Sequence, residues 1–394
     1  MYKVKKEHSN LLAVISLASF ILAPVISTQE TASPEMSLVI LAMLPAFVAW
    51  AMRKVKVENR GYGLPTMLFC VSAFISTFFS RYSEVDVRIL KYILFAVYFV
   101  LMSSIVFSEK NIKYIIDIYI IASIILAILI ILSKIFGYPH VESIFYQGRY
   151  SIGITGMYKN PNYITSFINI GYFFVLYRFI TDKKKFSQKM PQALVLLTFI
   201  SAMYFSGTRA ALLTALITTS LVLFTRSESN KFLIIGTLCL FFAVLFFVFS
   251  DDLAFLYGNF MGHRGSFEDE SRTETWFFAI VKLLDSPIFG YGLFGWGNVP
   301  GASRYMIHVH NIYIDILVSQ GIVGFLIFIY LFFNRIKKCI PQMRSFIYIF
   351  LFVNAFPLMF QNGFVEANFW RFMVINSVMI NYCSYTNPSI RKML

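Results

Sequence analysis

The chain has 394 residues, of which 58% are hydrophobic and only 14% are charged. Globular proteins carry roughly 25% charged residues, so this composition excludes a soluble protein of this size and makes lipid the natural solvent of most of the chain. The formal net charge of +14 falls in short clusters between apolar runs. That pattern is typical of membrane topology signals rather than of a nucleic-acid groove, and we expect no nucleic acid as a partner.

About twelve apolar segments are long enough to cross a bilayer, which requires about 20 mostly apolar residues. They predict an all-α polytopic membrane protein with one integral membrane domain over residues 1–394. The lysine-rich start resembles a signal peptide and is interpreted as leading into an uncleaved first helix. The expected spans are 11–28, 36–52, 64–80, 89–107, 114–136, 162–180, 192–207, 209–225, 232–250, 309–333, 344–360 and 368–385.

The basic residues predict the orientation of these spans. They cluster in alternate connections, such as 53–60, 183–189 and 335–344, whereas the connections 29–35 and 361–367 have none. Cytoplasmic connections carry the excess of lysine and arginine. Both termini are therefore expected on the cytoplasmic side.

The longest polar stretch, residues 251–308, is then a large extracytoplasmic loop between the ninth and tenth spans. It has seven acidic and four basic residues, so its bulk field does not attract anions. Ser271 and Glu274 have the spacing of a capping box, which predicts a short amphipathic helix that starts after Ser271 and ends before Pro287.

Arg209 closes a Ser206-Gly207-Thr208-Arg209 turn at the outer face, where a helix begins. One interpretation is an arginine that extends from a helix end to the membrane surface. The other is an anion site, because the free N–H groups and the positive dipole end of the helix lie beside the guanidinium group.

Two further arginines and one histidine are candidates on the same side. Arg272 is expected in the first turn of the loop helix, where it either pairs with a nearby acidic residue or binds an anion, and Arg149 stands between glycine and tyrosine. His310 opens the tenth span, where it either caps or packs the helix, or takes a proton from a sugar hydroxyl. No metal-ligand spacing is present, and no metal or cofactor is expected.

At this point four pieces of the sequence resemble the bacterial O-antigen ligase and O-antigen polymerase superfamily of membrane glycosyltransferases. The resemblance covers roughly residues 145–335. In chain order, the pieces are Lys159-Asn160-Pro161-Asn162, Ser206-Gly207-Thr208-Arg209-Ala210, Arg272 with Trp276 and the run Ser286-Pro287-Ile288-Phe289-Gly290-Tyr291-Gly292, and His310-Asn311 followed by Gly321 and Gly324.

The resemblance implies a GT-C-like fold and a metal-independent transfer of an undecaprenyl-diphosphate-linked glycan in the bacterial cytoplasmic (inner) membrane. It implies that Arg209 and Arg272 bind the diphosphate, with Arg149 as a weaker match, and that His310 is the catalytic base. The implied partners are a lipid-linked oligosaccharide donor, a glycan or lipid acceptor, membrane lipid and a chain-length regulator.

Several functions remain open from the sequence. We favour a polymerase of surface-polysaccharide repeat units (O-antigen, capsule or exopolysaccharide), and the close alternative is an O-antigen ligase that acts on lipid A-core. A lipid-linked glycan transporter (flippase) is the alternative from another class, although a transporter should place its polar residues near the midplane. A non-catalytic assembly subunit is a fourth interpretation.

Overall fold

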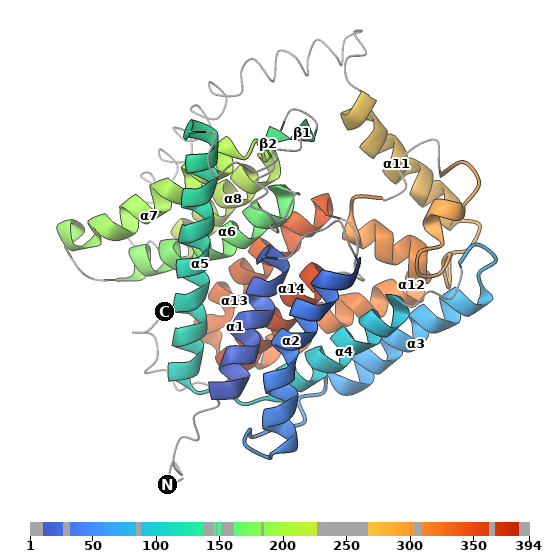
Figure 1. Ribbon diagram of the computed structural model, residues 1–394, viewed down its shortest axis with the longest axis horizontal. Coiled ribbons are helices and arrows are strands. Elements are labelled where there is room, and N and C mark those ends of the chain that lie inside the picture. Colours follow the sequence, from blue (N-terminus) through green and yellow to red (C-terminus); the bar gives the residue numbers. More distant parts are fainter. Residues whose placement is uncertain are drawn as a thin grey trace.

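The structure is a computed structural model that describes residues 11–26, 32–83, 88–136, 145–146, 149–150, 161–182, 185–226, 267–302, 309–361 and 367–385 (Figure 1). Apart from two short strands, its regular elements in these ranges are helical, which confirms the all-α prediction. The elements are α1 (Leu11–Ile26), α2 (Ala32–Ala51), α3 (Gly63–Phe79), α4 (Arg88–Ser104), α5 (Glu109–Phe136), β1 (Phe145–Tyr146), β2 (Arg149–Tyr150), α6 (Pro161–Thr181), α7 (Phe186–Phe205), α8 (Arg209–Arg226), α11 (Phe267–Leu283), η1 (Trp296–Asn298), α12 (Ile312–Phe333), η3 (Ile336–Lys338), α13 (Pro341–Ala355), η4 (Phe356–Phe360) and α14 (Ala367–Tyr385).

Eleven of the expected spans coincide with helices of the structure, and the ninth, 232–250, lies outside the described residues. Within the described ranges, four helical segments are long and apolar enough to cross a membrane: Glu109–Phe136, Asn162–Thr181, Ile312–Lys338 and Pro341–Phe360. Shorter apolar helices, among them Gly63–Phe79 and Arg209–Thr225, accompany them. The chain is a multi-pass membrane protein, whereas the count of twelve spans and the GT-C arrangement remain predictions.

Helix α6 is the most buried of the four candidate spans. In its most apolar stretch 78% of the residues are buried, against 39% in α5. It contacts α5, α7, α8 and α13, and aromatic rings fill these contacts, as in the Tyr119–Phe167 stack with ring centroids 4.1 Å apart. A helix that is apolar on all sides is buried on all sides, so α6 is the helix on which α5, α7, α8 and α13 pack.

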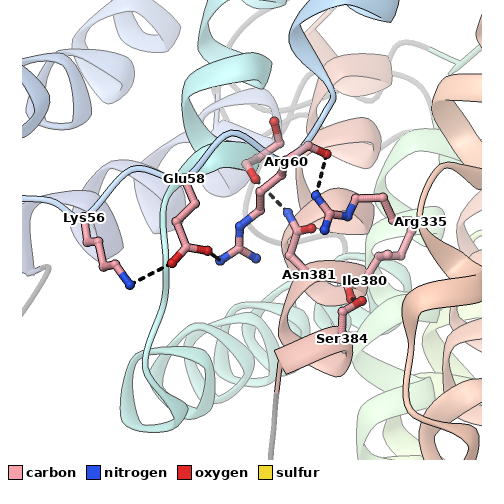
Figure 2. Close-up of polar contacts among 8 residues, drawn as sticks. Lys56, Glu58, Arg60, Arg335, Ile380, Asn381 and Ser384 are labelled. Carbon is pink, nitrogen blue, oxygen red and sulfur yellow. Dashed lines mark hydrogen bonds and ion pairs between the residues drawn. The ribbon is translucent and has the colours of Figure 1, made fainter. Parts of the chain in front are cut away.

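The connections at one end of the bundle carry many of the basic residues, and we call this the basic end. Its cations are Arg53, Lys54, Lys56, Arg60, Arg335, Lys337, Lys338 and Arg344. Arg335 Nη1 donates to the Arg60 carbonyl oxygen at 2.7 Å, and Asn381 Nδ2 donates to the Ser103 carbonyl oxygen at 2.7 Å (Figure 2). These bonds join the connection before α3 to the end of α12, and the end of α4 to α14.

The opposite end holds the starts of α6, α8 and α12 together with η4 and residues 284–302, and we call it the site end. The 284–302 segment covers the connection between α3 and α4: Asn298 Nδ2 donates to the Tyr82 carbonyl oxygen at 2.9 Å, and the Leu293 amide donates to Thr77 Oγ1 at 3.0 Å. Residues 284–302 therefore fold back onto the helix bundle.

Helix α12 is broken in its middle, at Gly321, where φ is 66° and ψ is −169°. Such a break leaves backbone groups without helical partners, which is tolerated at membrane depth only where protein satisfies them. Residues 287–292 do so. The Tyr291 and Gly292 amides donate to the carbonyl oxygens of Val318 (2.7 Å) and Ser319 (2.9 Å), and the Ile322 amide donates to the Pro287 carbonyl oxygen at 2.9 Å.

Candidate functional site

Arg209 is the first residue of α8, directly after the three-residue turn that joins α7 to α8, and its side chain is exposed. Gly207 in this turn has a φ of 66°, which favours glycine. Ser206 Oγ donates to Thr208 Oγ1 at 3.1 Å and accepts from the Thr208 amide at 3.3 Å. The turn thus has a fixed shape and places Arg209 at a helix N-terminus, where the dipole favours anions.

His310 lies two residues before α12, half-buried, with a φ of 52°. The sequence left capping open as its role, and that interpretation is wrong: Asn311 is the N-cap, and its Oδ1 accepts from the Tyr313 amide at 3.0 Å and from the Ile314 amide at 3.3 Å. A non-glycine residue in the left-handed region is uncommon and occurs preferentially at functional sites. The left-handed backbone at His310 therefore positions this residue just before the helix, outside its N-cap.

The short helix η4 contacts both the helix that starts at Arg209 and the helix that starts just after His310. It contacts α6, α8 and α12 as well as α13. Tyr313 Oη donates to the Ala355 carbonyl oxygen at 2.7 Å, and Asn162 Nδ2 donates to the Phe360 carbonyl oxygen at 3.4 Å. Pro357 lacks an amide hydrogen and explains why α13 tightens here instead of continuing to residue 360 as the sequence suggested. The helices that start at Arg209 and just after His310 thus share one neighbour.

Arg272 lies in α11, the loop helix. This helix starts at Phe267, so the prediction of Ser271 as its N-cap is wrong, and Arg272 is in the second turn rather than the first. Three acidic residues, 268–270, occupy the first turn, where they complement the helix dipole. The indole Nε1 of Trp276, one turn beyond Arg272, donates to the Val309 carbonyl oxygen at 2.8 Å. This bond fastens α11 to the residue before His310.

Arg149 begins β2, whose pairing with β1 sets Tyr146 opposite Arg149. Figure 1 shows this hairpin and α11 at the same end of the molecule. The side chains of Arg149 and Arg272 lie outside the described residues. Whether they meet Arg209 and His310 around one substrate therefore stays a prediction.

The structure adds one cation that the sequence analysis did not single out. Arg371, near the start of α14, is 1% exposed, and its guanidinium carbon lies 5.2 Å from the ring centroid of Phe167 and 4.6 Å from that of Phe372. The signal was present, since an arginine inside an apolar run requires a reason. It brings positive charge into the bundle near the start of α6.

Two of the glycine-containing pieces of sequence also meet. A Cβ at Gly290 would lie 2.7 Å from the Gly321 nitrogen, and a Cβ at Gly321 would lie 2.6 Å from the Phe289 nitrogen. Both glycines have positive φ. Their role is close backbone approach where residues 287–292 enter the break in α12, and contact with substrate is not needed to explain them.

Among the residues that the structure describes, no three histidine, cysteine, aspartate or glutamate side chains are grouped to hold a metal ion. No curated protein matches the chain. A family model described as O-antigen ligase matches residues 194–329. The matched segment contains Arg209, α11 with Arg272 and Trp276, His310 and the break at Gly321. Residues 194–329 are therefore similar to the O-antigen ligase family, which supports the superfamily that the sequence resembles.

Proposed function

We propose that the protein polymerises surface-polysaccharide repeat units at the outer face of the bacterial cytoplasmic membrane, with an undecaprenyl-diphosphate-linked glycan as donor. The family match supports membrane glycosyl transfer of the ligase and polymerase type. The observation that carries the proposal is the meeting of α8 and α12 at η4, because it sets a cationic helix start and a histidine at one end of the bundle.

The proposed chemistry uses the diphosphate as a leaving group. The acceptor hydroxyl oxygen attacks the anomeric carbon, His310 takes the hydroxyl proton, and the carbon–oxygen bond to the diphosphate breaks with its electron pair on the diphosphate. Arg209, Arg272 and Arg149 stabilise the charge that develops there, and placed hydrogen-bond donors of this kind commonly contribute about 10²–10³ in rate. An imidazole side chain is chemically suited to take this proton. No metal ion takes part in this proposal.

The acceptor distinguishes a polymerase from a ligase. In a polymerase both substrates carry a diphosphate, whereas in a ligase only the donor does. Three arginines carry more positive charge than one diphosphate diester requires. This excess charge supports the polymerase.

A ligase that transfers finished glycan to lipid A-core is the second candidate, because the matching family model bears the description O-antigen ligase. Both reactions use the same donor and the same leaving group. The number of diphosphates that must be bound is therefore the feature that separates the two candidates.

The test is the glycan profile of a deletion strain. Loss of a polymerase should leave single repeat units on the surface, and complementation with the wild-type chain should restore long polymer. Intact polymer that accumulates on the lipid carrier would instead identify the ligase. Unchanged surface glycan in the deletion strain would contradict both.

A further inference from the structure

A cavity of about 440 Å³ lies far from the site end, between α2, α3 and α4. Its floor is a single stripe of α4 from Ile93 to Ser104, and its walls include Trp50 of α2 and Met67 of α3. Trp50 and Met67 are each more than half exposed. In a membrane protein this surface faces lipid, so the cavity is a groove open to the bilayer, and we call it the α2–α4 groove.

The length of the groove matches one leaflet. Eleven residue steps of α4 at about 1.5 Å each give roughly 16 Å, and the hydrocarbon core of a bilayer is about 30 Å thick. Small side chains make it hollow: Gly63 and Thr66 line one wall and Ala96 lies on the floor. A volume of this size lies within the range of small-ligand sites, roughly 300–1,000 Å³.

The groove is closed at the basic end by the segment that connects α2 to α3. The Lys54 amide donates to the Ala49 carbonyl oxygen at 2.8 Å, the Glu58 amide to that of Ser104 at 2.9 Å, and the Val106 amide to that of Lys56 at 3.0 Å. These bonds fix the segment to the ends of both α2 and α4. Val57, from the same segment, lines the groove.

This closing segment is strongly cationic. It has four basic residues, Arg53, Lys54, Lys56 and Arg60, and one acidic residue, Glu58. Glu58 is shared by two of them, with Lys56 Nζ at 2.7 Å and Arg60 Nη2 at 3.2 Å (Figure 2). The side chains of Arg53 and Lys54 are exposed, and in sequence they stand between Trp50 and Val57, which both line the groove.

We propose that the α2–α4 groove is a binding site for an anionic phospholipid, with one acyl chain along α4 and the headgroup phosphate at Arg53 and Lys54. The length of one leaflet fits an acyl chain, and the cationic closure at one end of an apolar groove selects a negative headgroup. Because the positive-inside rule assigns the basic end to the cytoplasm, the lipid belongs to the cytoplasmic leaflet. This site is independent of the proposed glycosyl transfer.

The proposal can be tested by the fluorescence of Trp50, which lines the groove. Bromine atoms on a lipid chain quench tryptophan fluorescence on contact. The full chain is placed in vesicles of equal parts phosphatidylglycerol and phosphatidylcholine, with brominated chains on one lipid or on the other. The Trp50 contribution is the difference between the wild type and Trp50→Phe. We expect the quenching of Trp50 to correspond to a local concentration of phosphatidylglycerol at the groove at least about fivefold above that of phosphatidylcholine.

Matched variants separate the site from the general charge of the basic end. A cation near an anionic membrane surface contributes about fivefold in affinity, so Arg53→Gln with Lys54→Gln should abolish the enrichment. The pair Lys337→Gln and Lys338→Gln removes the same charge from exposed residues at the same end and should preserve it. Gly63→Leu should also abolish it, because a Cβ there has only ordinary contact, 3.9 Å from Val100 Cγ1, and the longer side chain would occupy the groove.

Equal quenching of Trp50 by the two brominated lipids in the wild type would overturn the proposal. Enrichment that persists in the Arg53→Gln, Lys54→Gln variant would overturn it as well. So would an equal loss of enrichment in that variant and in the Lys337→Gln, Lys338→Gln variant. Both double variants alter exposed side chains only, so their folding is expected to be preserved.

Discussion

The two ends of the bundle use positive charge in different ways. At the basic end, Arg60 is 4% exposed and bonded to Glu58, while Arg335 donates to the backbone of Arg60. At the site end, Arg209 presents an exposed side chain at a helix start, and His310 sits on left-handed backbone outside a capped helix. The difference indicates that the buried charges at the first end serve structure, while in our proposals its exposed charges bind lipid and those of the second end serve chemistry.

The largest effect is expected from substitutions that remove the proposed catalytic and diphosphate-binding side chains of the site end. His310→Ala, Arg209→Ala and Arg272→Ala should each lower glycosyl transfer by at least about 10²-fold, because each removes a base or a donor to the leaving group. Arg149→Ala should have a smaller effect. The readout is polymer length in a complemented deletion strain, with membrane insertion checked by protease accessibility. Lys337→Ala, at the basic end, is the matched control and should keep full activity.

The break in α12 offers a test of structure rather than chemistry. Gly321→Ala introduces a Cβ against the backbone of Ile288 and Phe289 at a positive φ, and we expect a loss of more than about 2 kcal/mol of stability. Thermal unfolding of the purified protein measures it. Gly63→Ala, at a helical glycine where an added Cβ would make only an ordinary contact with Val100 Cγ1 at 3.9 Å, should change the melting temperature little.

The indole bond between α11 and the His310 segment connects the two parts of the proposed site. Trp276→Phe keeps the ring but removes the donor to the Val309 carbonyl oxygen, so it should cost about 1 kcal/mol of stability. If the bond positions Arg272 relative to His310, transfer should fall about tenfold while the variant remains folded. Full activity in that variant would show that α11 reaches its place without this bond.

The smallest effect concerns the basic end. The hydrogen bond from Lys56, followed by the charges of Lys56 and Arg60, lowers the pKa of Glu58 despite its partial burial. A lowered pKa means that the stabilisation is present at neutral pH and is lost as the pH falls through the folded-state value. Glu58→Gln should thus lower stability at pH 7 by less than about 1 kcal/mol and leave activity unchanged. In melting curves, the difference between Glu58→Gln and the wild type should shrink as the pH falls from 7 towards 3.

Much of the fold was predictable because long apolar runs have few alternatives in a membrane. The runs at 114–136 and 162–180, for example, became α5 and α6 with boundaries shifted by at most a few residues. The break at Gly321 was not predictable, since it depends on residues 287–292, about thirty positions earlier, to satisfy its backbone groups. The start of α11 at Phe267 was not predicted, because the spacing of Ser271 and Glu274 is also that of a capping box and indicated a later start.

The candidate site was accessible to sequence reasoning only in part. Arg209 and His310 were selected because a helix start and an outer position are visible in the sequence. The role of η4 was not, because it depends on contacts among helices that are far apart in the chain. The buried position of Arg371 beside Phe167 likewise arises from the packing of α14 on its neighbours and not from local pattern.

The most direct test of the central claim is a transfer assay with the purified protein in vesicles that contain an undecaprenyl-diphosphate-linked repeat unit. The proposal predicts that glycan chains lengthen while free undecaprenyl diphosphate appears in equal amount, and that His310→Ala stops both. Movement of the intact donor across the bilayer without release of the carrier diphosphate would contradict it and identify a transporter instead.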